Sequence, residues 1–575
     1  MVGVGAPLPH SRSAGARSPF LFHSPPSPPF RDEVPRLPVL DGTDLSVAAR
    51  STQHRFHRDY DLSPALGYGD RSYLGPVIEA RSGVQTSVRL RNRMGEHPFA
   101  ADVDLSLHGV PEDFGSRPPT TLHLHGGVTR PRFDGHPEDF IVPGEALRNR
   151  YGNGQEAGSL WYHDHTLGTT RLNVYAGLAA PYLIRDEFDT GGEDNPLGLP
   201  AGEFEWPLVL QEKVFADGGR QSVRSVRLVP QGSWEGGAVG DRGLINGVVW
   251  PQLKVARGLY RFRICNAASL SVWNLHFSDR RRFWVIGNDL GLLDAPAPTR
   301  EVRMGPAERI DILVDFSDLR AGESVELRND EPVPLPAAAV GAKPMPLFGR
   351  FVATSERGHI GPVPTRLRGG SGRPAVLSPV ARPERSRDLT LIQDLDRRFP
   401  PTMMLLNNLH YDDEDIERPV QGTVEEWNLI NTTPDPHTIH LHLVHFRVIE
   451  RQRFSVWRYK LANHRPPVGT RWTPSADRFA WGSPSAPKQW ESGPKDTVHV
   501  DPHTITRILV RWPDRAELGF DPDQTFVPAG AEARMATTMP MSTAEDGRLG
   551  GYMWHCHMLD HEDHDMMARF RLVTG

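Results

Sequence analysis

Residues 554–566 read WHCHMLDHEDHDM, and this stretch decides the fold and the chemistry of the 575-residue chain. Cys556 lies between two histidines, His561 follows it by five residues and Met566 by ten. An electron-transfer site for a single copper ion uses one Cys, two His and a weak axial Met, so three of its four ligands occur here. Successive side chains of a strand point to opposite faces, so the two flanking histidines face away from Cys556. One strand can therefore supply two metal centres, one on each face.

Three other segments supply histidines in the same alternating pattern: HLHG (123–126), WYHDH (161–165) and HTIHLH (437–442). Each H-x-H pair projects both imidazoles from one face of a strand, and neutral imidazole suits copper. With the C-terminal stretch there are four such pairs, and their eight histidines can hold a three-copper cluster with two or three imidazoles per metal. His437 stands apart from its pair and completes the single-copper site.

The simpler interpretation of each motif is structural. A lone histidine is more often a hydrogen-bonded or surface residue, and a methionine commonly fills a gap in a core. Four pairs together with a Cys-His-Met loop make coincidence an inadequate explanation, so copper is the predicted metal. The second cysteine, Cys265, lies in the apolar run LYRFRICN and is expected to be buried and inert. Because Cys556 is committed to copper, no internal disulfide is expected.

Composition and charge favour an all-β protein without a nucleic-acid partner. The net charge of −6 over the whole chain gives no basic surface for nucleic acid. The chain has 54 Gly and 53 Pro, and short strand-like runs such as RIDILVDF (309–316) alternate with turn signals. No apolar stretch approaches the ~20 residues of a membrane helix, so no membrane contact is expected.

The first 35 residues are rich in Pro and Ser and are predicted to form a disordered tail. They contain no continuous apolar region of the kind found in a signal peptide. We therefore expect a cytoplasmic protein by default, with a spore-coat location or non-classical export as the open alternatives. The sequence makes no prediction of the oligomeric state.

Three structural domains are predicted to follow this tail, at residues 36–188, 204–352 and 387–575. Linkers rich in Gly, Asp and Pro, or in Pro, Ala and Arg, separate them. The first and third domains carry the histidine motifs and the second carries none. Because ligands from both ends of the chain must meet, the histidine cluster is expected at the interface of the first and third domains.

The chain resembles the multicopper oxidases, and the four histidine motifs occur in the order of that family. The resemblance is nearest to the bacterial three-domain branch of spore-coat laccase, bilirubin oxidase and phenoxazinone synthase. It rests also on the segments HLHGGVTRPRFDG (123–135), LWYHDHTLGTTRLNVYAGLAAPYLIRD (160–186), LINGVVWPQL (244–253) and HTIHLHLVHFRV (437–448). It implies an all-β chain of three cupredoxin-like Greek-key β-barrels that binds four copper ions.

Ligand types follow from the resemblance, motif by motif. It implies one type 1 copper, one type 2 copper and two type 3 coppers. The type 1 ligands are then His437, Cys556, His561 and Met566. The type 2 ligands are His123 and His440. The type 3 ligands are His125, His163, His165, His442, His555 and His557.

Two acidic residues match positions that assist proton delivery in the spore-coat laccase. Glu562 follows a ligand histidine, and Asp134 follows the first histidine pair by nine residues. A carboxylate near copper can relay protons or orient a ligand, and both roles stay open for each residue. Asp164 lies between two ligand histidines but on the opposite face, so a structural hydrogen bond is expected for it.

The resulting functional hypothesis is a laccase-like oxidase of phenols and aminophenols that reduces O2 to water. A narrower version is an o-aminophenol oxidase or a bilirubin oxidase. The alternatives are a cuprous or ferrous metal oxidase and, in another class, a copper-binding structural coat protein. The partners are then a small aromatic reductant and O2. The Trp- and Pro-rich segment 453–500 either borders the type 1 copper or is a surface excursion.

Overall fold

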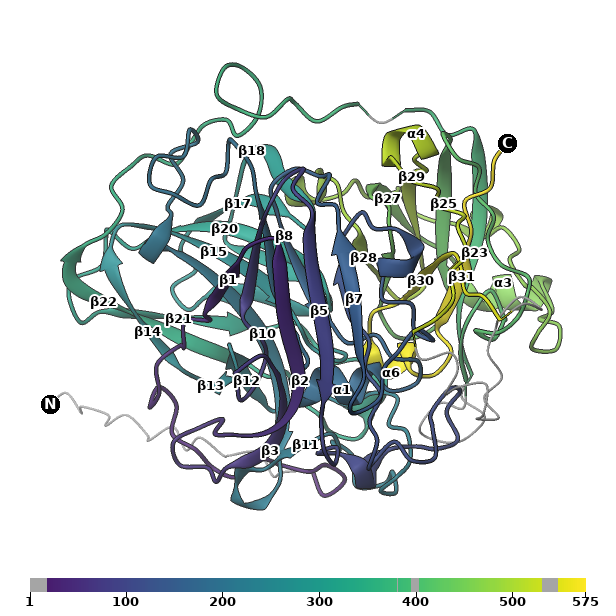
Figure 1. Cartoon of the computed structure of the whole chain (residues 1–575), viewed down its shortest axis with the longest axis horizontal. Coiled ribbons are helices and arrows are strands. Elements are labelled where there is room, and N and C mark those ends of the chain that lie inside the picture. Colours follow the sequence, from purple (N-terminus) through teal and green to yellow (C-terminus); the bar gives the residue numbers. More distant parts are fainter. Residues whose placement is uncertain (1–17, 380, 395–402, 530–546) are drawn as a thin grey trace, which may run out of the picture.

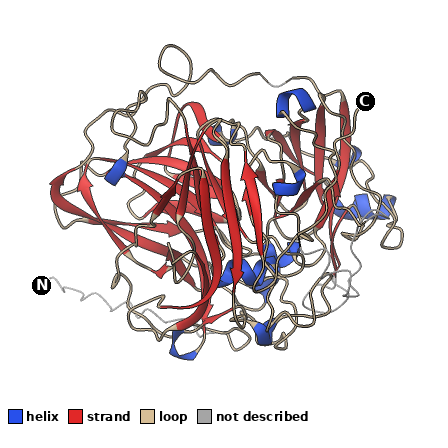
Figure 2. Ribbon diagram, in the orientation of Figure 1, coloured by secondary structure: helices blue, strands red, loops and turns tan. Residues whose placement is uncertain are grey.

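The computed structural model describes residues 18–379, 381–394, 403–529 and 547–575. Strands hold 39% of the residues and helices 8%, so the predicted all-β class is confirmed. Figure 2 shows strands running through the whole body of the molecule, with short helices beside them. The strands form six sheets, and these are arranged as three pairs that follow one another along the chain.

The first sheet pair lies between residues 39 and 185 and carries the first two histidine motifs. Its sheets have the strand orders β1-β4-β9-β8-β6 and β3-β2-β5-β7. Apolar side chains from both sheets, such as Val88 and Ile184, share one core, so the sheets pack face to face. The strands are β1 (Val39–Asp41), β2 (Asp44–His54), β3 (Ser63–Tyr68), β4 (Val77–Arg81), β5 (Thr86–Arg93), β6 (His123–His125), β7 (Ala146–Tyr151), β8 (Gly158–His163) and β9 (Ala179–Arg185).

The second sheet pair lies between residues 205 and 357. One sheet has the order β13-β12-β10-β15-β20-β17-β18, with β11 beside β10, and the other has the order β14-β22-β21-β16-β19. Cys265 is buried on β15, as predicted, and burial raises the pKa of its thiol to about 12. The strands are β10 (Glu205–Phe215), β11 (Gln221–Ser222), β12 (Arg242–Ile245), β13 (Val248–Val249), β14 (Gln252–Arg257), β15 (Leu259–Asn266), β16 (Trp273–Phe277), β17 (Phe283–Asn288), β18 (Gly291–Thr299), β19 (Glu301–Met304), β20 (Arg309–Asp315), β21 (Ser324–Asn329) and β22 (Leu347–Arg357).

The third sheet pair lies between residues 385 and 570 and carries the other histidine motifs. Its sheets have the orders β24-β23-β25-β29-β27 and β28-β26-β30-β31. Trp427 on β25 and Trp554 on β30 belong to the core between them. The strands are β23 (Arg385–Asp394), β24 (Met403–Leu406), β25 (Val424–Asn431), β26 (His437–Leu441), β27 (Phe446–Arg453), β28 (Thr497–Val500), β29 (Thr504–Arg511), β30 (Tyr552–Cys556) and β31 (Met567–Phe570).

Short helices connect the sheets. On α1, Arg171 forms an ion pair of 2.8 Å with Asp560 on α6, which ties the first sheet pair to the third. The described part of the chain has no helix long and apolar enough to cross a membrane. The α-helices are α1 (Thr170–Ala176), α2 (Leu335–Ala339), α3 (Val456–Ala462), α4 (Arg515–Leu518) and α6 (Leu559–Glu562), and the 3-10 turns are η1 (Ala100–Asp102), η2 (Pro131–Phe133), η3 (Gly202–Phe204), η4 (Asp217–Gly219), η5 (Asp477–Phe479) and η6 (Gln489–Glu491).

The three sheet pairs pack against one another around the first. In Figure 1 the first pair (purple to blue) is central, the second (teal) lies to the left and the third (green to yellow) to the right. One apolar cluster contains Leu183 on β9, Val209 on β10 and Leu559 on α6, so side chains from all three parts meet. This contact brings residues of the first and third pairs within reach of one another.

The predicted disordered tail is wrong for the described residues 18–35, while residues 1–17 lie outside the described part. The backbone N–H of Phe22 donates to the carbonyl of Ser225 at 2.8 Å. Ser24 is buried and its N–H donates to the Asp241 carboxylate at 3.0 Å. Leu21 is buried against Val226. The polar and Pro-rich composition suggested disorder, but the segment satisfies its hydrogen bonds on the second sheet pair instead.

A buried ion network joins the first two sheet pairs. Arg261 on β15 contacts Asp189 at 2.7 Å and Asp311 at 2.6 Å, and Arg263 donates to Ser159 on β8 at 2.9 Å. These side chains are almost fully excluded from solvent. Charges at such depth are tolerated because each is paired and hydrogen-bonded.

Replacing Arg261 with alanine removes one of the two guanidinium groups that pair with both Asp189 and Asp311 and leaves Arg263 as the other. Breaking a buried pair costs about 3–5 kcal/mol, so we expect the midpoint of thermal unfolding to fall by roughly 2–4 °C in scanning calorimetry. Arg280→Ala is the control, because Arg280 is 45% exposed in its pair with Glu301 and exposed pairs contribute about 0–1 kcal/mol. Equal midpoints for the two variants would contradict the assigned role of the network.

Candidate metal centres

Strands β26 and β30 form the framework of both candidate centres. They pair antiparallel, with Ile439 opposite Cys556 and His440 opposite His555. Paired residues point to the same face of a sheet, so Cys556 shares a face with Ile439 and, two residues earlier, with His437. His440 and His555 share the other face. The register therefore places the two groups of candidate ligands on opposite faces of one strand pair.

The first candidate centre consists of one thiol and two imidazoles. Cys556 Sγ lies 3.5 Å from His437 Nδ1 and 3.6 Å from His561 Nδ1, and the two nitrogens are 3.1 Å apart. Nitrogen and sulfur ligands lie about 2.0–2.3 Å from an ion such as zinc, so three of them in a plane are roughly 3.5–4 Å apart. The three atoms therefore fit around one metal ion of that size.

Neighbouring groups hold these ligands in place. His437 Nε2 lies 2.8 Å from Thr433 Oγ1, so the other ring nitrogen, Nδ1, faces the Cys556 thiol. Burial raises the pKa of the Cys556 thiol to about 12, which disfavours the thiolate. A bound metal ion reverses this preference, because a coordinating thiol is deprotonated outright. Met566, the predicted fourth ligand, is buried, and its carbonyl accepts a hydrogen bond from the Cys556 N–H at 2.9 Å.

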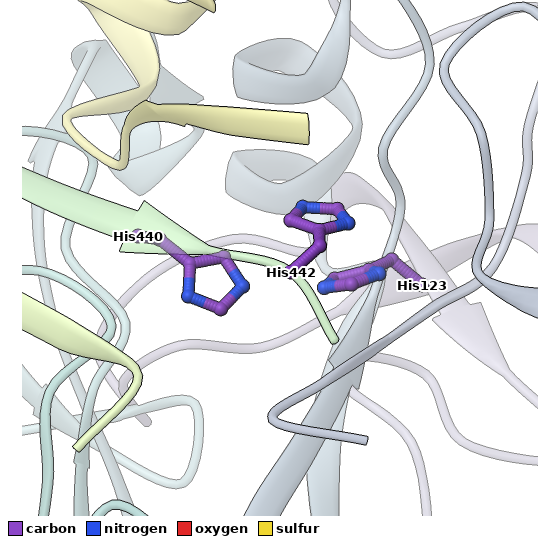
Figure 3. Close-up of side chains that lie close together, drawn as sticks. All are labelled: His123, His440 and His442. Carbon is purple, nitrogen blue, oxygen red and sulfur yellow. The ribbon is translucent and has the colours of Figure 1, made fainter. Parts of the chain in front are cut away.

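The second candidate centre consists of eight buried histidines. His442 Nε2 lies 3.2 Å from His555 Nε2, which lies 3.3 Å from His165 Nε2. The rings of His123 and His442 stack with centroids 3.9 Å apart, and Figure 3 shows His440 beside them on its strand. Two chain regions far apart in sequence thus meet here. The members are His123, His125, His163, His165, His440, His442, His555 and His557.

Buried ring nitrogens without a hydrogen-bond partner indicate where ions fit. His123 Nδ1 lies 2.6 Å from the Asp134 carbonyl and His440 Nδ1 lies 2.8 Å from the Asp496 carbonyl. Each of these rings leaves Nε2 buried and unpaired among the described residues. His125 is turned the other way, with Nε2 2.9 Å from Thr497 Oγ1 and Nδ1 unpaired. Metal-binding histidines show this arrangement, because one nitrogen takes the ion and the other donates to the protein.

The electrostatics of the cluster favour the ligand form of imidazole. Burial, followed by the neighbouring imidazoles, holds the pKa of His123 and His442 well below the usual value for histidine. Burial lowers the pKa of His163 to about 3. The rings of His123, His163 and His442 are therefore neutral near pH 7, and neutral imidazole is the form that binds copper.

The two predicted acidic residues both touch the histidine cluster. Asp134 Oδ2 lies 2.7 Å from His442 Nδ1, and burial raises the pKa of this carboxyl to about 7. Glu562 Oε2 lies 3.1 Å from His555 Nδ1, and Oε1 lies 3.6 Å from His165 Nδ1. Burial raises the pKa of Glu562, but these histidines outweigh it and hold the pKa below its usual range.

Asp164 has the structural surroundings expected for it. Its carboxylate accepts hydrogen bonds from Thr120 Oγ1 at 2.7 Å, from the Thr166 N–H at 3.0 Å and from Asn173 Nδ2 at 3.0 Å. These contacts fix the loop between the two histidines of the WYHDH motif.

Asp496 is a member of the cluster that the sequence did not reveal. Its carboxylate lies 3.1 Å from His125 Nε2, and Arg309 on β20 pairs with the same carboxylate. No motif distinguishes Asp496 from the other acids of its segment. Its place follows from the register of β28 on β26, where Thr497 lies opposite His440.

Segment 453–500 contacts the histidine cluster near its C-terminal end, through Asp496. Most of the segment lies away from both candidate centres. Phe454, Tyr459 and Trp472 form a core of their own against Ile392 and Ile505. None of the segment's residues lines the recess beside His561 among those that the structure describes. That recess is lined by Gly236, Gly237, Leu270, Pro334, Ala337, Gln393, Asp435, Pro436, Met558 and His561.

A thiol held between two imidazoles, next to eight further imidazoles, defines a redox-active copper protein. Comparisons agree with this class. Residues 115–189 and 382–516 match sequence models of the multicopper oxidase family. The laccase of Bacillus subtilis is 31% identical over 91% of this chain and 93% of its own length. Multicopper oxidase LPR1 of Arabidopsis thaliana is 30% identical over 95% of this chain and 93% of its own length.

A solved structure gives the same result for the fold. The multicopper oxidase McoA of Aquifex aeolicus superposes with a TM-score of 0.68 at 25% identity, covering 94% of this chain and 99% of that one. The chain belongs to the multicopper oxidase family, and it is a copper-dependent oxidoreductase with O2 as the electron acceptor. The predicted resemblance and the cupredoxin-like fold are therefore confirmed.

The contact of Asp496 with His125 yields a prediction for metal affinity. Asp496→Asn keeps the shape of the side chain but removes the charge that faces His125 Nε2. Loss of such a partner costs about 10–100-fold in metal affinity, so we expect the variant to lose copper to a chelator at correspondingly lower concentration. Asp501→Asn is the matched control, because Asp501 pairs with Arg303 at a part-exposed position. Equal copper retention by both variants would remove Asp496 from this role.

Proposed function

We propose that this chain is a laccase-like oxidase that takes single electrons from small aromatic reductants and reduces O2 to water. Phenols and aminophenols are the proposed substrate class. The observation that carries the proposal is the thiol of Cys556, which directly adjoins two buried histidines of the eight-histidine cluster, His555 on β30 and His557 just after it. The laccases among the relatives support it.

The proposed ligand sets are those of the four-copper arrangement. One copper is assigned to the thiol group and three to the eight histidines. The unpaired nitrogens and the ligand separations described above support this number. The proposed type 1 ligands are His437, Cys556, His561 and Met566, the type 2 ligands are His123 and His440, and the type 3 ligands are His125, His163, His165, His442, His555 and His557.

The proposed domain division is 36–188, 204–352 and 387–575. The first sheet pair falls within the first range, whereas β22 runs five residues past the second range and β23 begins two residues before the third; each sheet pair has its own apolar core. The proposed cluster then draws its histidines from the first and third domains.

The chain's own residues define the path between the two centres. Bound copper supplies the one-electron redox chemistry and the affinity for O2 that side chains lack. Cys556 is linked by single peptide bonds to His555 and His557, so covalent structure connects the two centres. Complete burial of all three side chains keeps water away from this connection. A rise of about 3.3 Å per residue keeps the centres within roughly 10 Å to 15 Å of one another.

Protons for O2 reduction are assigned to Glu562 and Asp134. Glu562 lies between His165 and His555 with both oxygens free of other hydrogen bonds from the described residues. Because its pKa is held low, this carboxylate suits a relay that takes up a proton at an oxygen and passes it inward at once. Asp134 is bonded to Thr129 and His442, so orienting a ligand is a second role for it.

A second candidate function, oxidation of ferrous or cuprous ions, has one specific observation in its favour. The Asp435 side chain lines the recess beside His561 and its Oδ1 is buried without a hydrogen-bond partner among the described residues. A carboxylate oxygen is a suitable ligand for Fe²⁺. A structural coat protein remains less well supported, because storing copper does not require a thiol site next to a histidine cluster.

The first test is the pair of variants Cys556→Ser and Cys265→Ser. We expect Cys556→Ser to lose the intense blue absorption and the O2 uptake, while elemental analysis finds about one copper ion fewer per chain. Cys265→Ser removes the other buried thiol and is expected to keep the colour and the activity. A Cys556→Ser protein that still turns over would contradict the assigned connection between the centres.

The substrate class is tested on the parent protein by O2 uptake with 2-aminophenol, 2,6-dimethoxyphenol, bilirubin and Fe²⁺. Faster uptake with the two phenolic compounds supports the laccase-like assignment, and preference for 2-aminophenol or bilirubin narrows it. Uptake with Fe²⁺ alone would overturn it in favour of the metal oxidase.

Glu562→Gln tests the proton role. The amide keeps the shape of the side chain but cannot take up a proton, and general acid–base groups contribute about 10²–10⁴-fold to rates. We expect O2 reduction to slow by at least about 10²-fold with the blue absorption and the copper content preserved. Glu450→Gln, in a part-exposed pair with Arg507, is the control. An unchanged rate would exclude Glu562 from proton delivery.

A further inference from the structure

A groove of about 230 Å³ lies where the N-terminal segment crosses the second sheet pair. One wall is formed by Leu21 and Phe22 of that segment, and another by Val239 and Gly240. The third wall is the loop that follows α2, from Val340 to Pro346. Most of these lining groups are apolar, which suits an aromatic ring.

This groove adjoins the recess beside His561. Gly237 and Ala337 line both hollows, so the two are neighbours and share a wall. His561 belongs to the proposed type 1 site. A molecule in the groove is therefore separated from the recess beside His561 only by the wall that the two hollows share.

One cation without a carboxylate partner lines the groove, and two more stand over the Phe22 ring of its wall. Lys343 lines it, is exposed and makes no ion pair with the described residues. Arg224 and Arg227 stand over the Phe22 ring at 4.9 Å and 4.4 Å, and neither has an ion pair within the described ranges. The lining acid, Asp241, is already paired with Arg242 at 3.3 Å. The unbalanced charge of the groove is thus positive, which favours an anionic occupant.

We propose that this groove binds the anionic end of an aromatic reductant, such as a phenol that carries a carboxylate or sulfonate. The oxidisable ring lies in the groove, against the wall that the groove shares with the small recess beside His561, and Lys343 attracts the anionic group. Phe22 supplies an apolar face whose ring is already flanked by two guanidinium groups. This inference rests on the proposed laccase-like function and names a substrate class for its type 1 side.

The kinetic test compares syringate with 2,6-dimethoxyphenol, which differ by one carboxylate on the same ring. The measured quantity is the ratio of kcat/KM for the anion to that for the neutral phenol. An exposed charge pair is worth a factor of about three, so Lys343→Ala is expected to lower the ratio about threefold and Lys343→Glu about tenfold, through KM. The effect should shrink at high ionic strength because salt screens exposed charges.

Lys254→Ala is the matched control, because Lys254 is an exposed lysine that pairs with Glu33 outside the groove. We expect it to keep the ratio of the parent protein. A ratio that is the same in all three variants would overturn the proposal. If the parent protein oxidises neither phenol, the proposed function itself fails, which is a different result.

A binding measurement separates the groove from turnover. The probe is 3,4,5-trimethoxybenzoate, which lacks a free phenol, titrated into the copper-loaded protein by calorimetry beside its uncharged amide. Tighter binding of the carboxylate, weakened by Lys343→Glu and by Phe22→Ala but not by Lys254→Ala, supports the site. Equal affinity for the acid and the amide would overturn it, whether or not the protein oxidises phenols.

Discussion

The antiparallel register of β26 on β30 is the constraint on which the rest of the structure depends. Ile439 lies opposite Cys556 and His440 opposite His555, so a slip by one residue moves every candidate ligand of one strand to the wrong face. That register is protected by burial, because both faces of the strand pair are covered. On one face lies the core around the thiol, and on the other lies the histidine cluster.

Much of the site could be predicted because its ligands follow strand periodicity. Spacing alone predicts that His437 lies on the opposite face of its strand from His440 and His442. It also predicts that Cys556 lies on the opposite face from His555 and His557. Asp496 could not be predicted, since its contact with His125 joins residues hundreds of positions apart and depends on sheet register. Residues 18–35 were mistaken for a disordered tail because composition does not report a backbone that finds its partners on another part of the chain.

The second sheet pair holds none of the candidate ligands, yet it shapes both centres. From β20 it supplies Arg309, whose ion pair with Asp496 adjoins His125. Its loops supply Gly236 and Gly237, which line the recess beside His561. The network around Arg261 fixes this sheet pair to the first, so the walls of both centres keep a constant position relative to the ligands. A middle unit without metal therefore acts as the support for the two that flank it.

The histidine cluster draws on residues 123–165 and on residues 440–557, and this has a consequence for biosynthesis. A nascent chain that has left the ribosome only as far as β25 holds half of these imidazoles and lacks the thiol. The other half arrives with the last strands, and the second sheet pair must by then be in position between them. Assembly of the full histidine set thus waits until His557 has left the ribosome, after the whole of the second sheet pair has been made.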